Sequence, residues 1–198
     1  MNKKQAVQLL KKYSPDDRTF RIVLRHAIKV REVAEEIAQR IPEADLNLVR
    51  CGALLHDIGR YKCPPWKDSE RHGIEGAKIL RAEGHCSLAR IAERHLGGGL
   101  RKEDIIERRL RLPRKDFLPL TTEEKIVCYA DKLVGQNDEC ITLSSTLESF
   151  KKKFGIMAAN RIAQLHSELT GLIKSGGSKP GKAKGRAKKA RPKDNSKG

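Results

Sequence analysis

The chain has 198 residues and a net charge of +17, and aromatic residues make up only 4% of it. This length suits one domain with an appendage, and a core with so few aromatics must rest on Leu, Ile, Val and Ala, which favours helices. No apolar run approaches the roughly 20 residues of a membrane-spanning helix, and the first residues lack the pattern of a signal peptide. We therefore expect a cytoplasmic protein with no membrane partner.

The cysteines point to the same compartment. Their number is odd and no two are spaced as CxxC, which excludes zinc-finger and thioredoxin-type motifs. Scattered thiols in a chain without a signal peptide fit a reducing cytoplasm, and each is expected to be a small buried hydrophobe. The five are Cys51, Cys63, Cys86, Cys128 and Cys140.

The first predicted helix follows residues 14–17, SPDD. A capping hydroxyl, a proline in the first turn and two acids near the positive end of the helix dipole are typical of a helix start. Apolar residues from Ile22 to Ile37 recur at steps of three and four and predict one apolar face, on which His26 also lies. Pro42 should close this helix.

Helical periodicity continues along the chain, and no segment shows convincing strand alternation. Residues 121–124, TTEE, predict a capping box at the start of one helix, and an irregular loop is expected around Pro113 and Pro119. The further helices are predicted over residues 46–56, 69–84, 87–95, 102–110, 121–134 and 156–173. We therefore predict an all-α domain over residues 1–174.

The last segment, residues 175–198, differs in composition. It carries nine Lys and Arg and one Asp, about half of the excess positive charge, and no large apolar residue. Such a segment cannot bury enough surface to offset its ordering entropy, so we predict a disordered basic tail. Two interpretations stay open: non-specific, salt-sensitive contact with nucleic acid, or a solubilising tail without a specific partner.

Polar residues on the predicted inward faces carry the functional signal. The stretch GALLHDIGRYK ends an apolar run with His56 and Asp57, and burying either group is costly unless it is paired or bound to a metal. Asp131 lies in an apolar helix and needs a cation, whereas a single histidine such as His26 is more often satisfied by a carbonyl. His72 and His95 each lie near a helix end, where side chains can converge.

Together these four histidines and two aspartates suit a divalent transition metal such as Mn, Fe, Co, Ni or Zn. Six ligands exceed the need of one tetrahedral site and suffice for two ions with water completing each shell. His85, in a turn, and His166, in the last helix, are interpreted as lying outside this set.

The order His26, His56-Asp57, Asp131 resembles the signature of the HD superfamily of metal-dependent phosphohydrolases. HDIG at residues 56–59 matches the HDIG subgroup, and HAIKVREVAEEIA and EEKIVCYADKL are similar to its neighbouring words. RHGIEGA and ERHLGGGL are similar to inserts that supply extra histidines in members with two metals. The resemblance covers residues 18–134 and is nearest to small stand-alone HDIG-domain proteins of archaea.

The resemblance implies an HD-domain helical bundle with a central metal site. His26, His56, Asp57 and Asp131 would hold a first ion, and Asp57 would bridge to a second. It further implies hydrolysis of a phosphomonoester or phosphodiester of a nucleotide or other small phosphorylated substrate, with Asp57 and Arg60 as catalytic residues. Arg60 and Lys62 are the candidates for binding the substrate anion. The set implied to ligate metal is His26, His56, Asp57, His72, His95 and Asp131.

Two departures from the family pattern bear on the substrate, and a shared ligand set leaves alternative functions open. A His-His pair common in enzymes that cleave cyclic dinucleotides is His95-Leu96 in this chain, and their glycine-tyrosine-proline signature is missing, which argues against that substrate. Diiron oxygenases of the superfamily use the same ligand set. The alternatives are therefore an iron oxygenase or a non-catalytic protein that binds a nucleotide or RNA.

Overall fold

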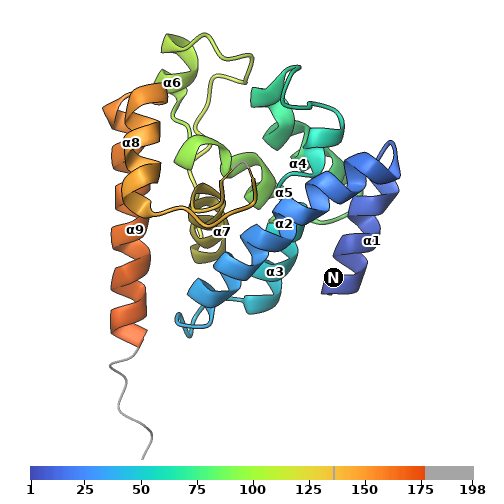
Figure 1. Ribbon diagram of the computed structural model, residues 1–198, viewed down its shortest axis with the longest axis horizontal. Coiled ribbons are helices and arrows are strands. Elements are labelled where there is room, and N and C mark those ends of the chain that lie inside the picture. The colour runs from blue at the N-terminus through green and yellow to red at the C-terminus, as the bar shows by residue number, and fades with distance from the viewer. Residues whose placement is uncertain (136, 177–198) are drawn as a thin grey trace, which may run out of the picture.

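The computed structural model describes residues 1–135 and 137–176, and helices dominate it (Figure 1). No β-strand occurs among these residues, which confirms the all-α prediction; only two isolated bridges, Leu100–Phe117 and Val134–Cys140, are present. The helices are α1 (Lys3–Tyr13), α2 (Asp17–Ala38), α3 (Leu46–Leu55), α4 (His72–Ala82), α5 (Cys86–Arg94), α6 (Lys102–Glu107), α7 (Thr122–Lys132), α8 (Leu143–Phe154) and α9 (Ile156–Gly176). Three short 3-10 helices, η1 (Ile58–Tyr61), η2 (Ser69–Arg71) and η3 (Leu96–Gly98), connect some of them.

Helix α3 lies at the centre of the bundle and packs against α1, α2, α5 and α7. Six of its ten residues are buried, so its sequence is apolar on most sides rather than along one stripe. Asp45 caps it by accepting hydrogen bonds from the backbone amides of Asn47 and Leu48. The end of this central helix therefore delivers His56 directly into the interior.

Helix α2 is amphipathic, as the sequence predicts, with two corrections. Its N-cap is Asp16, whose carboxylate accepts a hydrogen bond from the Thr19 amide; Ser14 instead ends α1. Ile22 was expected on the apolar face but is 53% exposed, whereas Val23, one residue on, is buried. The buried face of α2 packs on α3 and α7 and carries His26 between them.

Two helices were missed by the sequence analysis. Helix α1 begins with a capping box, in which the side chains of Asn2 and Gln5 each accept a hydrogen bond from the other's backbone amide. The apolar face of this helix packs into the core, where Leu10 is fully buried. Helix α8 begins at the Thr142 cap and forms a hairpin with α9. Both sequences are interrupted by many polar and basic residues, so their apolar faces are narrow.

Helix α9 packs against α7 and buries Ile162 and Leu169 in the same core as α2 and α3. It extends to Gly176, so residues 175 and 176, the first two of the predicted tail, are helical. The rest of that tail, residues 177–198, lies outside the described residues. Within the described residues, no helix combines the length and apolar character needed to cross a bilayer.

The cysteine prediction was partly wrong. Cys51, Cys63 and Cys128 are buried, but Cys86 and Cys140 are exposed. All five thiols are free, in keeping with the absence of a paired spacing. Cys86 starts α5 and Cys140 lies in a connecting segment, positions where the chain reaches the surface.

Candidate metal centre

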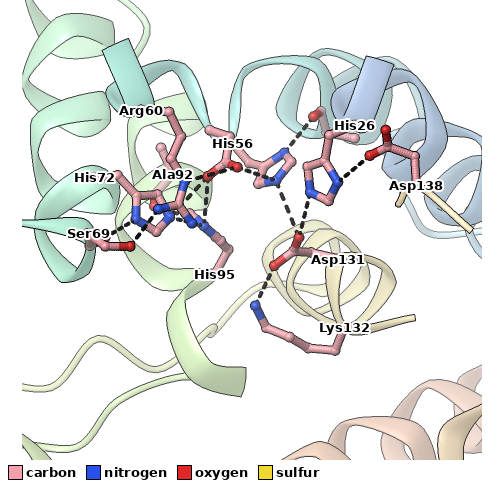
Figure 2. A network of polar contacts seen from close by, with 12 residues as sticks. His26, His56, Arg60, Ser69, His72, Ala92, His95, Asp131, Lys132 and Asp138 are labelled. Carbon is pink, nitrogen blue, oxygen red and sulfur yellow. Dashed lines mark hydrogen bonds and ion pairs between the residues drawn. The ribbon is translucent and has the colours of Figure 1, made fainter. Parts of the chain in front are cut away.

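The structure brings together all six residues that the sequence singled out (Figure 2). Each comes from a helix end or from the inward face of a helix, and the carriers are neighbours in the bundle. His26 lies within α2, His56 caps α3, Asp57 precedes η1, His72 begins α4, His95 caps α5 and Asp131 lies in the last turn of α7.

Three of the imidazoles share one local arrangement. The Nδ1 atoms of His56, His72 and His95 each lie within hydrogen-bond distance of the carbonyl oxygen three residues earlier, for example 2.7 Å from His56 to Ala53. A carbonyl oxygen can only accept, so each Nδ1 carries the proton and donates it. In the neutral ring the Nε2 lone pair then faces the interior, which is the orientation a metal ligand requires.

Asp57 lies between two groups of these atoms. Its Oδ1 is 3.0 Å from His72 Nε2 and 3.5 Å from His95 Nε2. Its Oδ2 is 3.8 Å from His56 Nε2. The two imidazoles on the Oδ1 side, His72 and His95, approach each other to 2.9 Å between their Nε2 atoms.

The second carboxylate, Asp131, joins the remaining histidines. Its Oδ1 is 3.1 Å from His26 Nε2 and 3.5 Å from His56 Nε2. Three sets of ligand atoms thus lie mutually close enough to hold an ion: His26–His56–Asp57, His56–His95–Asp131 and Asp57–His72–His95. These His and Asp groups are consistent with divalent-metal binding, and Asp57 contributes to two of them.

The carboxylates of Asp57 and Asp131 require positive charge close to them. Burial acts to raise the pKa of Asp57, but His72, His56 and Arg60 hold it well below its usual range. Burial likewise opposes ionisation of Asp131, whose pKa is held well below its usual range by Lys132 and by the histidines. Both groups are therefore ionised at neutral pH. Two adjacent buried carboxylates need compensating cations, which protons or a divalent ion can supply.

The histidines respond differently to the same surroundings. Burial lowers the pKa of His95 to about 3, so this imidazole is neutral at pH 7 and its approach to Asp57 is not an ion pair. Burial also acts to lower the pKa of His26, but Asp131, Asp57 and Asp138 raise it to about 9. A neutral, desolvated imidazole such as His95 is ready to ligate a metal, whereas His26 must exchange its proton for one.

Two atoms provide a direct test of whether a metal fits. His56 Nε2 and Asp57 Oδ1 are fully buried and receive no hydrogen bond within the described residues. The Nε2 atom of His72 lies 3.0 Å from Asp57 Oδ1, but in the neutral ring its proton is on Nδ1, which donates to a carbonyl. Buried polar atoms without partners are costly, and both atoms face the cluster. An ion coordinated by them removes that cost, so the donor set fits a divalent metal.

Sequence reasoning missed two residues that touch the cluster. Asp138 accepts from His26 Nδ1 at 3.2 Å and also pairs with Arg25. It follows α7 in a short connection with φ of +60°, and no periodic signal marks it. Lys132 contacts Asp131 Oδ2 and is nearly buried. A lysine directly after the acid in an apolar helix was a signal that could have found it.

The substrate-binding candidates occupy different positions. Arg60 lies beside the cluster, with Nε 3.3 Å from Asp57 Oδ2 and Nη1 2.8 Å from Ser69 Oγ (Figure 2). Lys62 is exposed, and within the described part of the chain its only hydrogen bond is from its backbone amide to the Gly59 carbonyl. His85 lines a surface pocket with Met1, away from the cluster.

His166 also lies apart from the cluster, on the exposed side of α9. Its Nδ1 contacts the Tyr129 hydroxyl at 2.7 Å. It therefore serves as a histidine control in experiments on the metal ligands.

Gly59 allows two elements of the candidate centre to approach closely. The chain continues through it as η1, which packs against α4. A Cβ at this position would lie 1.9 Å from the His72 carbonyl oxygen and 2.5 Å from the Gly76 amide nitrogen. Only glycine allows this approach, which holds the start of α4, and so His72, against Asp57.

Comparison with known proteins places this geometry in context. A model of the HD domain family matches residues 23–135. An uncharacterized protein of Methanocaldococcus jannaschii is 39% identical over 181 residues, 88% of this chain and 100% of that protein. The prediction that the chain resembles HD proteins of archaea is thereby confirmed.

Two further relatives are much longer. The tRNA (cytidine(56)-2'-O)-methyltransferases of Picrophilus torridus and Thermoplasma volcanium are 40% and 38% identical to this chain over 169 residues. That match spans 85% of this chain but 46% of each methyltransferase, so the chain covers less than half of their length.

Among solved structures, the HD domain of the phosphodiesterase PgpH of L. monocytogenes is similar in fold. The TM-score is 0.50 with 19% sequence identity, over 84% of this chain and 98% of that domain. At this identity the likeness speaks for the fold alone.

Proposed function

This chain belongs to the HD domain family, and from that premise we propose that it is a metal-dependent phosphohydrolase acting on a nucleotide or another small phosphorylated substrate. The observation that carries the proposal is Asp57, which turns one carboxylate oxygen toward His72 and His95 and the other toward His56. We propose as ligands the six residues of the cluster, His26, His56, Asp57, His72, His95 and Asp131.

The metal would supply the reactive chemistry. A divalent ion held by these residues would lower the pKa of bound water toward neutrality and would withdraw charge from a phosphoryl oxygen. The protein contributes orientation, because hydrogen bonds to backbone carbonyls set the rings of His56, His72 and His95 before any ion arrives.

Positive side chains on two sides of the cluster support a phosphate substrate. Arg60 lies next to Asp57, and Lys132 lies next to Asp131 (Figure 2). Arg60 presents a planar fork of donors that matches phosphate oxygens, and part of its side chain is accessible to solvent. We propose that Arg60 binds the phosphate and that Lys132 offsets the charge of Asp131. Lys62 is a secondary candidate, close in sequence but exposed.

The test combines metal analysis with turnover. Wild type, Asp57→Ala and His166→Ala are purified without chelator or affinity-tag metal, and metal per chain is measured together with hydrolysis of p-nitrophenyl phosphate and bis(p-nitrophenyl) phosphate. We expect one or two ions and hydrolysis in wild type and in His166→Ala, and loss of both in Asp57→Ala, because Asp57 contributes to two ligand groups.

Other results would redirect the proposal. A fully loaded protein that hydrolyses neither ester nor any nucleotide tested would contradict it. Iron in the purified protein together with substrate-dependent oxygen consumption would favour the oxygenase alternative, which uses the same donors.

A second candidate, an RNA-directed role, rests on separate observations. The tRNA methyltransferases named above share this domain at about the identity of the stand-alone relative. The described structure also carries basic residues at the C-terminal ends of α6 and α8, which a contact between Arg108 and Phe154 brings together. This basic surface consists of the exposed residues Arg108, Arg109, Lys151, Lys152 and Lys153. The Arg108 guanidinium lies 4.7 Å from the centre of the Phe154 ring, so one aromatic side chain lies among these cations.

This candidate predicts tRNA binding that weakens with salt. Replacing Lys151, Lys152 and Lys153 by Ala should reduce the dependence of log affinity on log salt by up to about one unit per lost phosphate contact. A matched double variant on α1, Lys3→Ala with Lys4→Ala, should leave it unchanged. Truncation after Gly176 measures the contribution of the tail separately, and wild-type slopes in the lysine variant would remove this surface from consideration.

A further inference from the structure

Trp66 is the only tryptophan of the chain, and 85% of its surface is exposed. It is the most exposed large hydrophobic residue of the described structure, ahead of Leu120 at 65%. Single exposed apolar side chains are common and mean little by themselves. The position of Trp66, in a loop next to the candidate metal centre, distinguishes it from such residues.

Trp66 lies in the loop that joins η1 to η2, and both ends of that loop belong to the candidate metal centre. Arg60, in η1, bonds the Ser69 hydroxyl at 2.8 Å, and η2 leads directly into His72. Trp66 is three residues from Ser69, so their Cα atoms are at most about 11 Å apart. The backbone of Trp66 therefore lies within about 11 Å of that of Ser69, whose hydroxyl is bonded by the arginine proposed to bind phosphate.

The loop is built to hold its tip in place. Pro64 and Pro65 have fixed φ angles, and the Lys67 amide donates to the Pro64 carbonyl at 3.0 Å, which closes a turn around Trp66. Before the turn, the buried Cys63 anchors the chain; after it, Asp68 pairs with Arg111 at 2.9 Å. A ring presented by a stiff loop loses little conformational freedom when a ligand packs against it.

The charges around this ring are suited to an anionic ligand. Lys62 and Lys67 flank it in sequence and are exposed. The acids that follow, Asp68 and Glu70, are both paired with Arg111, so the two lysines are the unpaired charges next to the ring in the described structure. An aromatic face among cations is the combination that binds nucleotides, because every base has a face that can stack.

We propose that Trp66 stacks on the base of a nucleoside phosphate whose phosphate lies at the metal centre beside Arg60. This inference rests on the proposed phosphohydrolase function and names its substrate class. The ligand is either a free nucleotide or a nucleotide within RNA, and the experiment separates the two sources.

Intrinsic fluorescence gives a direct readout because no other tryptophan contributes. The full-length protein, loaded with zinc, which has no unpaired electrons to quench emission, is titrated with adenosine monophosphate, ribose 5-phosphate and a short oligoadenylate RNA. We expect saturable quenching by adenosine monophosphate and none by ribose 5-phosphate, which lacks a base. Tighter quenching by the oligonucleotide than by the mononucleotide assigns the ligand to RNA, and the reverse assigns it to the free nucleotide.

Variants then measure the contribution of the ring to substrate preference. Trp66→Ala should reduce the preference for adenosine monophosphate over ribose 5-phosphate, measured by competition or by KM, roughly tenfold. Trp66→Phe should retain most of that preference, because a smaller aromatic ring still stacks. The control is Met157→Ala, an exposed apolar residue on α9, which should change nothing.

The inference fails if both phosphates bind equally well or if Trp66→Ala retains the preference. It also fails if anionic phospholipid vesicles shift the emission to the blue while adenosine monophosphate has no effect, since Trp66 would then contact lipid. Quenching by nucleotide without hydrolysis under any metal would keep the base site and overturn the phosphohydrolase. Hydrolysis of nucleotides that does not depend on Trp66 would support the phosphohydrolase and overturn the base site.

Discussion

At the scale of single residues, the four histidines obtain their orientation in two ways. His56, His72 and His95 each donate to a carbonyl in their own preceding turn, so local backbone is enough. His26 lies in the middle of a helix, where those carbonyls are already engaged, and it depends on Asp138, 112 positions later. Its ring is therefore oriented by tertiary structure alone.

Asp138→Asn should weaken metal binding at the group that contains His26. A carboxylate behind an imidazole raises its basicity as a ligand, and losing such a partner costs about 10- to 100-fold in affinity. Competition with a chromophoric chelator measures the change. Asp17→Asn, which removes a carboxylate from an exposed ion pair with Lys11 at the start of α2, is the control and should retain wild-type affinity. Unchanged affinity in Asp138→Asn would show that the metal site does not need this contact.

At the scale of elements, the site depends on how closely neighbouring segments approach. Helix α4 reaches Asp57 only because η1 presents Gly59 to it, and α5 is held to α7 by the buried Glu124. Both contacts join elements that carry proposed ligands. Small changes in these contacts should therefore affect stability and metal binding together.

Gly59→Ala should destabilise the fold by about 3 kcal/mol, because the added methyl overlaps backbone atoms that cannot move aside as a side chain could. Urea denaturation measures the loss, and metal content should fall with it as His72 is displaced. Gly171→Ala, in α9 where a Cβ meets nothing within 4 Å, should instead stabilise by up to about 1 kcal/mol. Equal stability of the two variants would contradict the packing argument.

Glu124→Gln should cost about 2 kcal/mol at pH 7, since the carboxylate accepts from Arg90, Arg94 and the Leu120 amide. Burial opposes ionisation of Glu124, but these three partners lower its pKa. A lowered folded-state pKa means that the stabilisation is complete above the unfolded-state value and is lost as pH falls through the folded-state pKa. The difference between wild type and variant should therefore shrink in acid, measured by denaturation at pH 7 and near pH 3. A difference independent of pH would show that the charge does not matter.

At the scale of the whole molecule, the candidate centre ties together helices that are distant in sequence. His26 and Asp131, 105 residues apart, approach to 3.1 Å, and the clustered residues come from α2, α3, α4, α5 and α7 or from their ends. An ion held there crosslinks α2, α3, α4, α5 and α7. Its binding free energy should therefore appear in the global stability of the fold.

Removing the metal by chelation should lower the unfolding temperature of the wild type. A ligand at a hundredfold excess over its dissociation constant contributes about 2.7 kcal/mol, which for a chain of this size corresponds to several degrees. Calorimetry with and without chelator measures the shift. Asp57→Ala should show no such shift, whereas His166→Ala should retain it; equal shifts in all three would place the metal elsewhere.

The amino-acid sequence alone determined the helical class and most helix boundaries, because periodicity and capping depend on residues that are neighbours in the chain. It also determined the identity of the six clustered residues, because the resemblance through HDIG depends on their order in the sequence. Tertiary structure decided the rest: that Asp57 lies between two groups of histidines, that Asp138 and Lys132 join the cluster, and that Gly59 permits the contact with α4. The tail from residue 177 lies outside the described residues and stays a prediction. Contacts between residues a hundred positions apart leave no periodic trace in a single sequence, since they depend on how buried faces pack rather than on which residues are neighbours in the chain.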